Sequence, residues 1–208
     1  MYLFSRFRHV NSASMREGVA AAVEVAGMAS TITGLDVGAW MTIASREVAR
    51  INWSAMFENL DELQAATEKL AGSTEYGDWV DAHDKLFDGP AEDALLQIVH
   101  GAPDPDRTVN FVAGIEAVCA NGKLSAGLAA GVELAEAFTK ISGSPILFAV
   151  RRTGLYGGVV WIAGAESLGA LAALEETLFA DPSWAPLVDQ HGPAFEPGGE
   201  TVWFQRLS

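Results

Sequence analysis

One segment of this chain occurs twice, at positions 108 residues apart. The most distinctive trace is Val80-Asp81-Ala82-His83 followed by Phe87, which returns as Val188-Asp189-Gln190-His191 followed by Phe195. Between residues 53 and 88, 12 of 36 ungapped pairs are identical, whereas unrelated segments of this composition would share roughly a quarter as many. The other identical pairs are Trp53/Trp161, Ala55/Ala163, Glu58/Glu166, Leu60/Leu168, Leu63/Leu171, Ala65/Ala173, Glu68/Glu176 and Leu70/Leu178. The sequence therefore predicts two copies of one structural unit.

The repeat divides the 208 residues into two halves of about 100 residues each. We expect a first repeat over residues 1–101, a second over residues 107–208, and a linker over residues 102–106. The linker contains Pro103 and Pro105, and each proline lacks a backbone donor and biases the preceding residue towards extended geometry. A chain of this length could also form one domain, so the boundary depends on the repeat.

The sequence pattern predicts the same order of helices and strands in each half. Hydrophobic spacing and turn residues place strands, helices and a hairpin at corresponding positions in both halves. The first half reads as strand 2–8, helix 15–33, strands 35–44 and 48–57, helix 60–70, a further helical turn and strand 95–100; the second reads as strand 109–117, helix 123–141, strands 146–152 and 158–163, helix 168–179 and strand 201–207. This is the β-α-β-β-α-β order of a ferredoxin-like unit, an α+β fold with both helices on one face of an antiparallel sheet. We expect the two apolar uncovered faces to shield each other, sheet to sheet.

The segment Trp79-Val80-Asp81-Ala82-His83 resembles a pattern of the dimeric α/β-barrel superfamily, in particular of its antibiotic-biosynthesis-monooxygenase-like group. In that group two ferredoxin-like units pack sheet on sheet into a barrel, so the resemblance implies an intrachain pseudo-dimer made by tandem duplication. It also implies a small-molecule pocket in each half, between the sheet and the second helix. In haem-degrading members a tryptophan precedes the histidine by about ten residues; Ser73 and Asp181 stand there in this chain, which disfavours haem degradation.

His83 and His191 are the candidate catalytic residues, because imidazole titrates near neutrality and two of the four histidines occupy equivalent positions. The alternative is that each histidine has only a structural role, which duplication would copy equally well. Asp81 and His83 are two residues apart and do not share a helical face, so the spacing predicts no acid–histidine dyad.

The candidate ligand-binding residues are aromatic or basic. Trp53, Trp161 and Trp79 could line an apolar pocket, although core packing explains a buried tryptophan equally well. Arg6 and Arg206 lie on predicted strands and could pair with a carboxylate or phenolate of a ligand. Pairing with nearby aspartate or glutamate is the alternative. Two helices carry a central glycine, Gly27 and Gly131, and we expect close helix–sheet packing to explain both.

The composition narrows the partners and the compartment. A net charge of −14 repels phosphate backbones and anionic lipid, so neither nucleic acid nor membrane is an expected partner. A single cysteine, Cys119, cannot form an internal disulfide, and no apolar run is long enough to span a membrane, so we expect a cytoplasmic protein. The pseudo-dimer could associate further as a homodimer.

These observations favour a small-molecule-binding protein, with a cofactor-independent monooxygenase-like enzyme acting on an aromatic or polyketide-like substrate as the first hypothesis. No metal and no cofactor is expected in that case. A non-catalytic ligand-binding or stress-associated barrel protein is the alternative, and haem binding through a histidine is a third. The halves differ where Lys85 and Leu86 become Pro193 and Ala194. A polar cavity around only one of the two histidines would favour an enzyme or a ligand-binding protein.

Overall fold

The computed structural model describes all residues from Met1 to Ser208. The first half contains three helices, four strands and two short 3₁₀ turns. In chain order these elements are β1 (Tyr2–Val10), α1 (Met15–Thr33), β2 (Gly38–Ile43), β3 (Arg50–Phe57), α2 (Leu60–Ala71), α3 (Thr74–His83) and β4 (Phe87–His100), with the 3₁₀ turns at Ser12–Ser14 and Asp84–Leu86.

The second half repeats this order. Its elements are β5 (Phe111–Val118), α4 (Leu124–Ser142), β6 (Ile146–Arg151), β7 (Gly158–Ala165), α5 (Leu168–Ala180), α6 (Trp184–His191) and β8 (Glu200–Arg206), with a 3₁₀ turn at Gly192–Ala194. The predicted α+β class and the β-α-β-β-α-β order of each half are confirmed. The largest boundary error concerns β4, which begins at Phe87 and not near Leu95.

The chain forms two compact units, and two strands have residues in both. Unit 1 comprises Met1–Leu95 and Phe204–Ser208, and unit 2 comprises Leu96–Trp203. Within unit 1 the strand order is β4-β1-β3-β2, and within unit 2 it is β8-β5-β7-β6. The end of β4 pairs with β6 in unit 2, and in unit 1 the N–H of Leu207 donates to the carbonyl oxygen of Ala39 at 2.8 Å. Each half therefore contributes the end of its last strand to the other unit.

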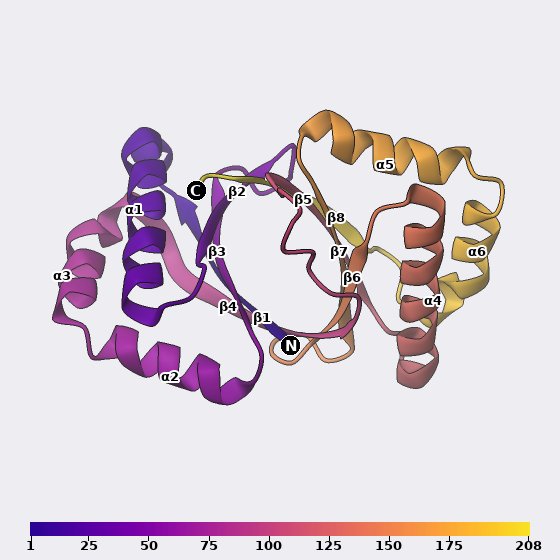
Figure 1. The fold of residues 1–208 in the computed structure, drawn as a ribbon, viewed down its shortest axis with the longest axis horizontal. Coiled ribbons are helices and arrows are strands. Elements are labelled where there is room, and N and C mark those ends of the chain that lie inside the picture. The colour runs from indigo at the N-terminus through magenta and orange to yellow at the C-terminus, as the bar shows by residue number, and fades with distance from the viewer. The chain divides into compact units, whose positions relative to one another are not determined.

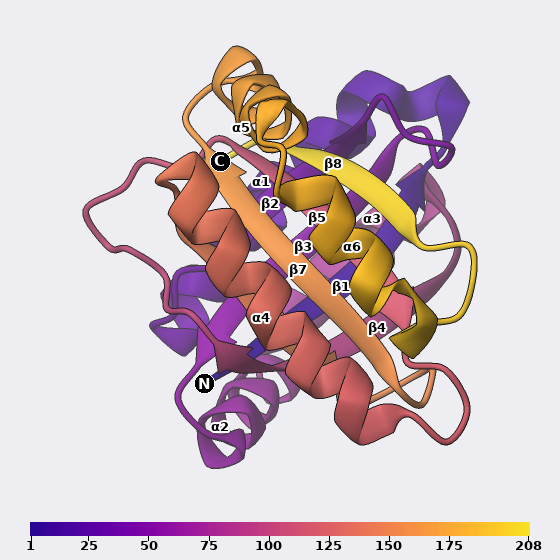
Figure 2. The same cartoon turned by 90° about the vertical axis from the view of Figure 1, so that its right-hand side faces the viewer.

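Within each unit the helices lie on one side of the sheet (Figure 1). In Figure 2, α4 and α6 lie in front of the unit 2 sheet, on either side of β7. A matching hydrogen bond joins helix and sheet in both units: Trp53 Nε1 donates to Ala22 O, and Trp161 Nε1 donates to Gly131 O, both at 2.9 Å. The duplication predicted from sequence is thus preserved in individual contacts.

The helix-facing side of each sheet forms the core. Ile51 in unit 1 and Phe148 and Val159 in unit 2 are fully buried. Gly131 allows α4 to approach β6 closely, because a Cβ at that position would lie 2.0 Å from Phe148 Cζ. The same explanation is wrong for Gly27, since a Cβ there would meet nothing within 4 Å.

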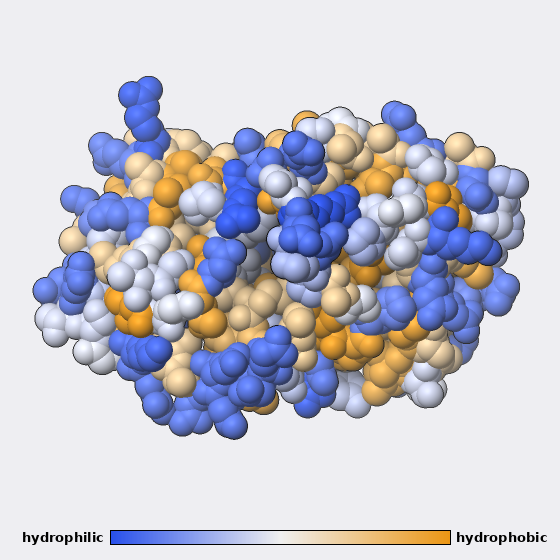
Figure 3. Space-filling view, in the orientation of Figure 1, coloured by the Kyte–Doolittle hydropathy of each residue, from blue (hydrophilic) through white to orange (hydrophobic).

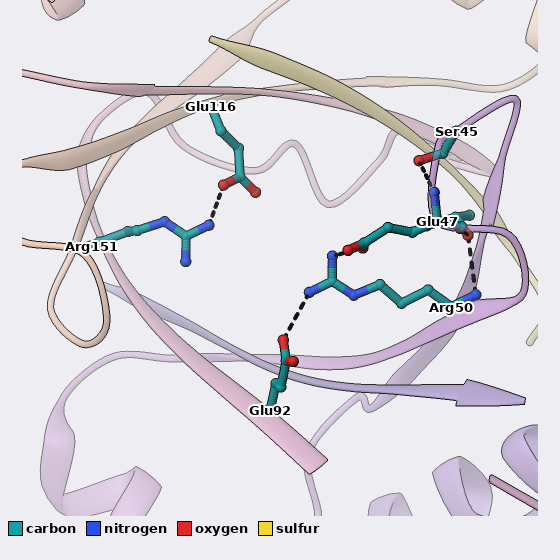
Figure 4. A network of polar contacts seen from close by, with 7 residues as sticks. Ser45, Glu47, Arg50, Glu92, Glu116 and Arg151 are labelled. Atoms are coloured by element: carbon teal, nitrogen blue, oxygen red, sulfur yellow. Dashed lines mark hydrogen bonds and ion pairs between the residues drawn. The ribbon is translucent and has the colours of Figure 1, made fainter. Parts of the chain in front are cut away.

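The opposite side of each sheet carries charged residues. In unit 1 Arg50 forms ion pairs with Glu47 and, at 3.6 Å, with Glu92, and its guanidinium lies 4.0 Å from the Phe7 ring centroid. In unit 2 Arg151 pairs with Glu116 (Figure 4). The uncovered face of each sheet is therefore not wholly apolar, and its charged residues are paired within their own unit.

Apolar residues also reach the surface of both units between charged ones (Figure 3). Phe179 is 77% exposed and Ile115 is 38% exposed. None of the helices has the length and hydropathy that a membrane crossing requires.

Candidate functional site

Unit 1 contains a cavity of about 190 Å³ between its sheet and its three helices. Strands β1 and β3 form one wall, and residues of α1, α2 and α3 form the others. The apolar part of the lining consists of Phe4, Val25, Ala29, Leu35, Val37, Trp53, Ala55, Phe57, Leu63, Ala66, Leu70, Val80, Phe87 and Ala91. A few polar groups interrupt this lining, which is the usual composition of a small-molecule site.

Arg6 reaches the cavity because alternate residues of β1 point towards the helices. Its Nε and Nη2 atoms donate to the two carboxylate oxygens of Asp93 at 2.7 and 2.8 Å. The hydrogen bond to Asp93 is the largest cause of a raised pKa of Arg6, and the nearby Tyr76 hydroxyl adds to it. Because the pair is almost half exposed, its energetic value is small. It fixes the guanidinium and leaves Nη1 free of Asp93.

Of the two arginines in the lining, Arg8 is more buried than Arg6. Its Nη1 donates to Asp84 at 2.7 Å and its Nη2 donates to the carbonyl of Gly89 at 2.7 Å. Its guanidinium carbon lies 5.2 Å from the Phe87 ring centroid, within cation–π range. The Nε atom is buried and has no hydrogen-bond partner in the protein. Arg8 is therefore held rigidly while one of its donors is unsatisfied.

His83 and Trp79 form a stacked pair at the end of α3. Their ring centroids are 4.2 Å apart with an interplanar angle of 16°. His83 Nδ1 lies 2.8 Å from the backbone oxygen of Trp79. A carbonyl oxygen can only accept, so Nδ1 carries the hydrogen, and in the neutral ring Nε2 is the atom able to take a proton. Trp79 Nε1 is buried and, like Arg8 Nε, has no partner.

Unpaired buried donors are rare in proteins, and two of them belong to residues lining one cavity. An N–H that loses water without gaining an acceptor costs about 1–3 kcal/mol. A ligand oxygen would remove that cost at either donor. The cavity thus offers an apolar slot, two arginines, a histidine with one free nitrogen, and unsatisfied N–H groups.

Unit 2 has a cavity of about 470 Å³, but its chemistry differs. Ile115 lies opposite Trp161 in the β5–β7 ladder, as Arg6 lies opposite Trp53 in the β1–β3 ladder. Two residues further along, Ala117 lies opposite Val159, as Arg8 lies opposite Ile51 in unit 1. No arginine, lysine or histidine lines this second cavity. Only unit 1 combines a cavity with its repeated histidine.

The structure brings four of the predicted site residues together, namely His83, Arg6, Trp53 and Trp79, all in the lining of the unit 1 cavity. Trp161 lines the unit 2 cavity. His191 lies outside that lining, with Nε2 2.9 Å from Glu133 Oε2 of α4.

Arg206 lies outside the unit 1 cavity. It pairs with Asp36 at 3.6 Å, and its guanidinium carbon lies 5.5 Å from the Trp40 ring. Pairing with a nearby acidic residue, the alternative given for Arg6 and Arg206, therefore describes both, and Arg8 pairs with Asp84 in the same way.

Sequence reasoning did not select Arg8, Tyr76 or Asp84, which also line the cavity. The sequence could have indicated Arg8, because it is two residues from Arg6 and so lies on the same face of the strand. Tyr76 and Asp84 had none, since their positions depend on how α3 packs against the sheet. No group of three or more His, Cys, Asp or Glu side chains is arranged to hold a metal ion.

Comparison with known proteins supports the fold. No protein-family profile and no curated protein sequence matches the chain. A candidate monooxygenase of Fusobacterium nucleatum subsp. nucleatum ATCC 25586 is similar in structure, with a TM-score of 0.73 and 9% identity over 100% of this chain and 92% of that one. A candidate monooxygenase of Lactobacillus acidophilus NCFM is similar with a TM-score of 0.68 and 11% identity, over 100% of this chain and 94% of that one.

An anthrone oxidase-like protein gives a TM-score of 0.63 at 10% identity, over 99% of this chain and 90% of that one. Identities this low establish a common fold and leave activity open. All three matches extend over nearly the full length, as expected for chains built from two repeats. The chain therefore has the dimeric α/β-barrel fold, in the tandem arrangement of these monooxygenase-like proteins.

Proposed function

We propose that this chain binds a small phenolic aromatic molecule in the unit 1 cavity and promotes its oxidation by molecular oxygen, with His83 as the base. The observation that carries the proposal is the lining of that cavity. It combines an apolar slot with His83, Arg6, Arg8 and two unsatisfied N–H donors. The corresponding cavity of unit 2 has none of these polar groups.

The size of the cavity favours a ligand of one or two rings. At about 190 Å³ it is slightly larger than the engineered cavity of about 150 Å³ that binds benzene. Trp53 and Phe57 would pack against the ring. The phenolic oxygen would accept from Arg8 Nε or Trp79 Nε1, which have no other acceptor.

The proposed chemistry starts with transfer of the phenolic proton to His83 Nε2. The nearby guanidinium groups of Arg6 and Arg8 stabilise the phenolate, and the apolar surroundings strengthen this attraction. The electron-rich ring carbon para to the oxygen then reacts with O₂. One oxygen atom becomes the second carbonyl of a quinone and the other leaves as water, with the phenolic proton and the para hydrogen. The substrate supplies all the electrons, so the reaction needs no other reductant.

The structural neighbours agree with this proposal at a coarse level. Two are described as candidate monooxygenases and a third as anthrone oxidase-like. The small cavity gives less support to haem binding, because a haem is several times larger than benzene.

The test combines binding with oxygen consumption. Binding of 2-naphthol is followed by its absorption, which distinguishes the naphthol from the naphtholate, and turnover of a dihydroxynaphthalene is followed with an oxygen electrode. We expect His83→Asn to retain the hydrogen bond to Trp79 O while slowing oxygen uptake at least about 100-fold, the usual size of a general-base contribution. His191→Asn, the equivalent change in the other repeat, should leave uptake unchanged.

Equal loss in both variants, or none in either, would contradict the assignment of His83. Saturable naphthol binding without oxygen consumption would favour the non-catalytic alternative. A Soret shift with added haemin that disappears in His83→Asn would favour haem binding instead.

A further inference from the structure

The unit 2 cavity lacks the cationic groups of its counterpart. Ile115 and Ala117 replace Arg6 and Arg8 in the strand register. The single indole N–H of Trp161 is already satisfied by Gly131 O at 2.9 Å. None of the unpaired buried polar atoms belongs to this lining. A phenolate or carboxylate would find no positively charged side chain there.

The cavity nevertheless remains open and apolar. Its volume of about 470 Å³ is more than twice that of the unit 1 cavity. Aromatic side chains dominate the wall: Trp184 packs edge-on against Phe138 with ring centroids 6.5 Å apart, and Phe195 packs edge-on against Trp161 at 5.5 Å. Phe179, also part of the lining, is 77% exposed. Val188 and Ile115 of the lining are also exposed, at 40% and 38%, so the apolar cavity is accessible to a ligand from solvent.

The only charged residues in the lining are acidic. Asp189 has no ion-pair partner, and Glu196 accepts only a backbone N–H, that of Asn121, at 3.1 Å. The whole chain carries a net charge of −14, which adds to the attraction for a cation. An apolar cavity whose only charges are two carboxylates is complementary to an apolar molecule with one positive charge.

We propose that the unit 2 cavity is a second ligand site, distinct from the unit 1 site, and that it binds amphiphilic amines. The apolar body of the ligand would pack between Phe138, Trp161, Trp184 and Phe195. Its ammonium group would lie beside Asp189 and Glu196. The two repeats would then bind ligands of opposite charge, an aromatic anion in unit 1 and an apolar cation in unit 2.

Three probes with the same tail and different head groups test the proposal: octylamine, 1-octanol and octanoate, each titrated calorimetrically. One exposed ion pair changes an equilibrium constant by up to about fivefold. With two carboxylates we expect octylamine to bind about five- to tenfold more tightly than octanol at low salt, and octanoate to bind most weakly. High salt should reduce the preference.

Variants locate the site. Asp189→Asn with Glu196→Gln should abolish the preference for the amine and leave octanol binding unchanged. Asp81→Asn, at the equivalent position of the first repeat and outside the unit 1 lining, is the matched control and should change nothing. Ala185 is exposed at the cavity wall, so Ala185→Trp should block all binding there without unfolding the chain.

Octanoate binding as tightly as octylamine would overturn the proposal. So would the absence of binding by all three probes to the folded chain, or octylamine binding that Ala185→Trp leaves intact. Loss of 2-naphthol binding in unit 1 variants has no bearing on these outcomes, so the two sites are tested separately.

Discussion

Gly131 and Gly27 occupy the middle of two equivalent helices, and we expect alanine to have opposite effects at the two positions. At Gly131 the new Cβ would lie 2.0 Å from Phe148 Cζ and 2.5 Å from Cε2. The Phe148 ring is fully buried and packs against Trp161 with centroids 5.1 Å apart, so it cannot swing into solvent. At Gly27 the new Cβ would meet nothing within 4 Å.

The expected magnitudes follow from these distances. Alanine is favoured over glycine in a helix interior by about 1 kcal/mol, and this gain applies at both positions. Overpacking a filled core costs about 1–3 kcal/mol. Because the contact at Gly131 is so short, we place its cost at the upper end. Gly131→Ala should then lower the free energy of unfolding by about 2 kcal/mol and Gly27→Ala should raise it by about 1 kcal/mol.

Urea unfolding, monitored by tryptophan fluorescence and by circular dichroism, measures both effects. The slope of free energy against urea should stay unchanged, since neither variant alters the surface exposed on unfolding. If the two units unfold separately, Gly131→Ala should move only the transition of unit 2. Finding Gly131→Ala as stable as Gly27→Ala would refute the close helix–sheet contact.

Three smaller predictions follow from other contacts. Trp161→Phe removes the indole hydrogen bond to the carbonyl of Gly131, which keeps its helical partner, and the lost bond should cost about 0.5–1.5 kcal/mol in urea unfolding. Burial raises the pKa of the Cys119 thiol, so its reaction with a disulfide reagent should be slow in mildly alkaline buffer and fast in denaturant. Hydrogen bonds from the Ser183 hydroxyl and N–H lower the pKa of Asp181. Its contribution to stability is present at neutral pH and is lost as the pH falls through that lowered pKa; Ser183→Ala should raise the pKa in an NMR titration.

The repeat made most of the fold predictable, because two copies of a pattern distinguish signal from chance. The offset of 108 residues places Trp53 and Trp161 on matching hydrogen bonds. The start of β4 was not predictable, since Gly89 and Pro90 read as strand breakers. The bidentate pair between Arg6 and Asp93 shows that this segment nevertheless approaches β1.

The arrangement of the candidate site was predictable where local spacing determines position. His83 and Trp79 are four residues apart on one helix, so their contact follows from helical geometry. His191 shares the position of His83 but contacts Glu133, a residue of a different helix that sequence does not place near it. The unequal chemistry of the two cavities depends on strand register, which determines that Ile115 takes the position of Arg6.

A crystal structure of the chain with 2-naphthol bound tests the central claim most directly. We predict the two rings inside the unit 1 cavity, the hydroxyl within hydrogen-bond distance of Arg8 Nε or Trp79 Nε1, and His83 facing that hydroxyl. Naphthol found only outside this cavity, or a cavity closed by its own side chains, would contradict the account.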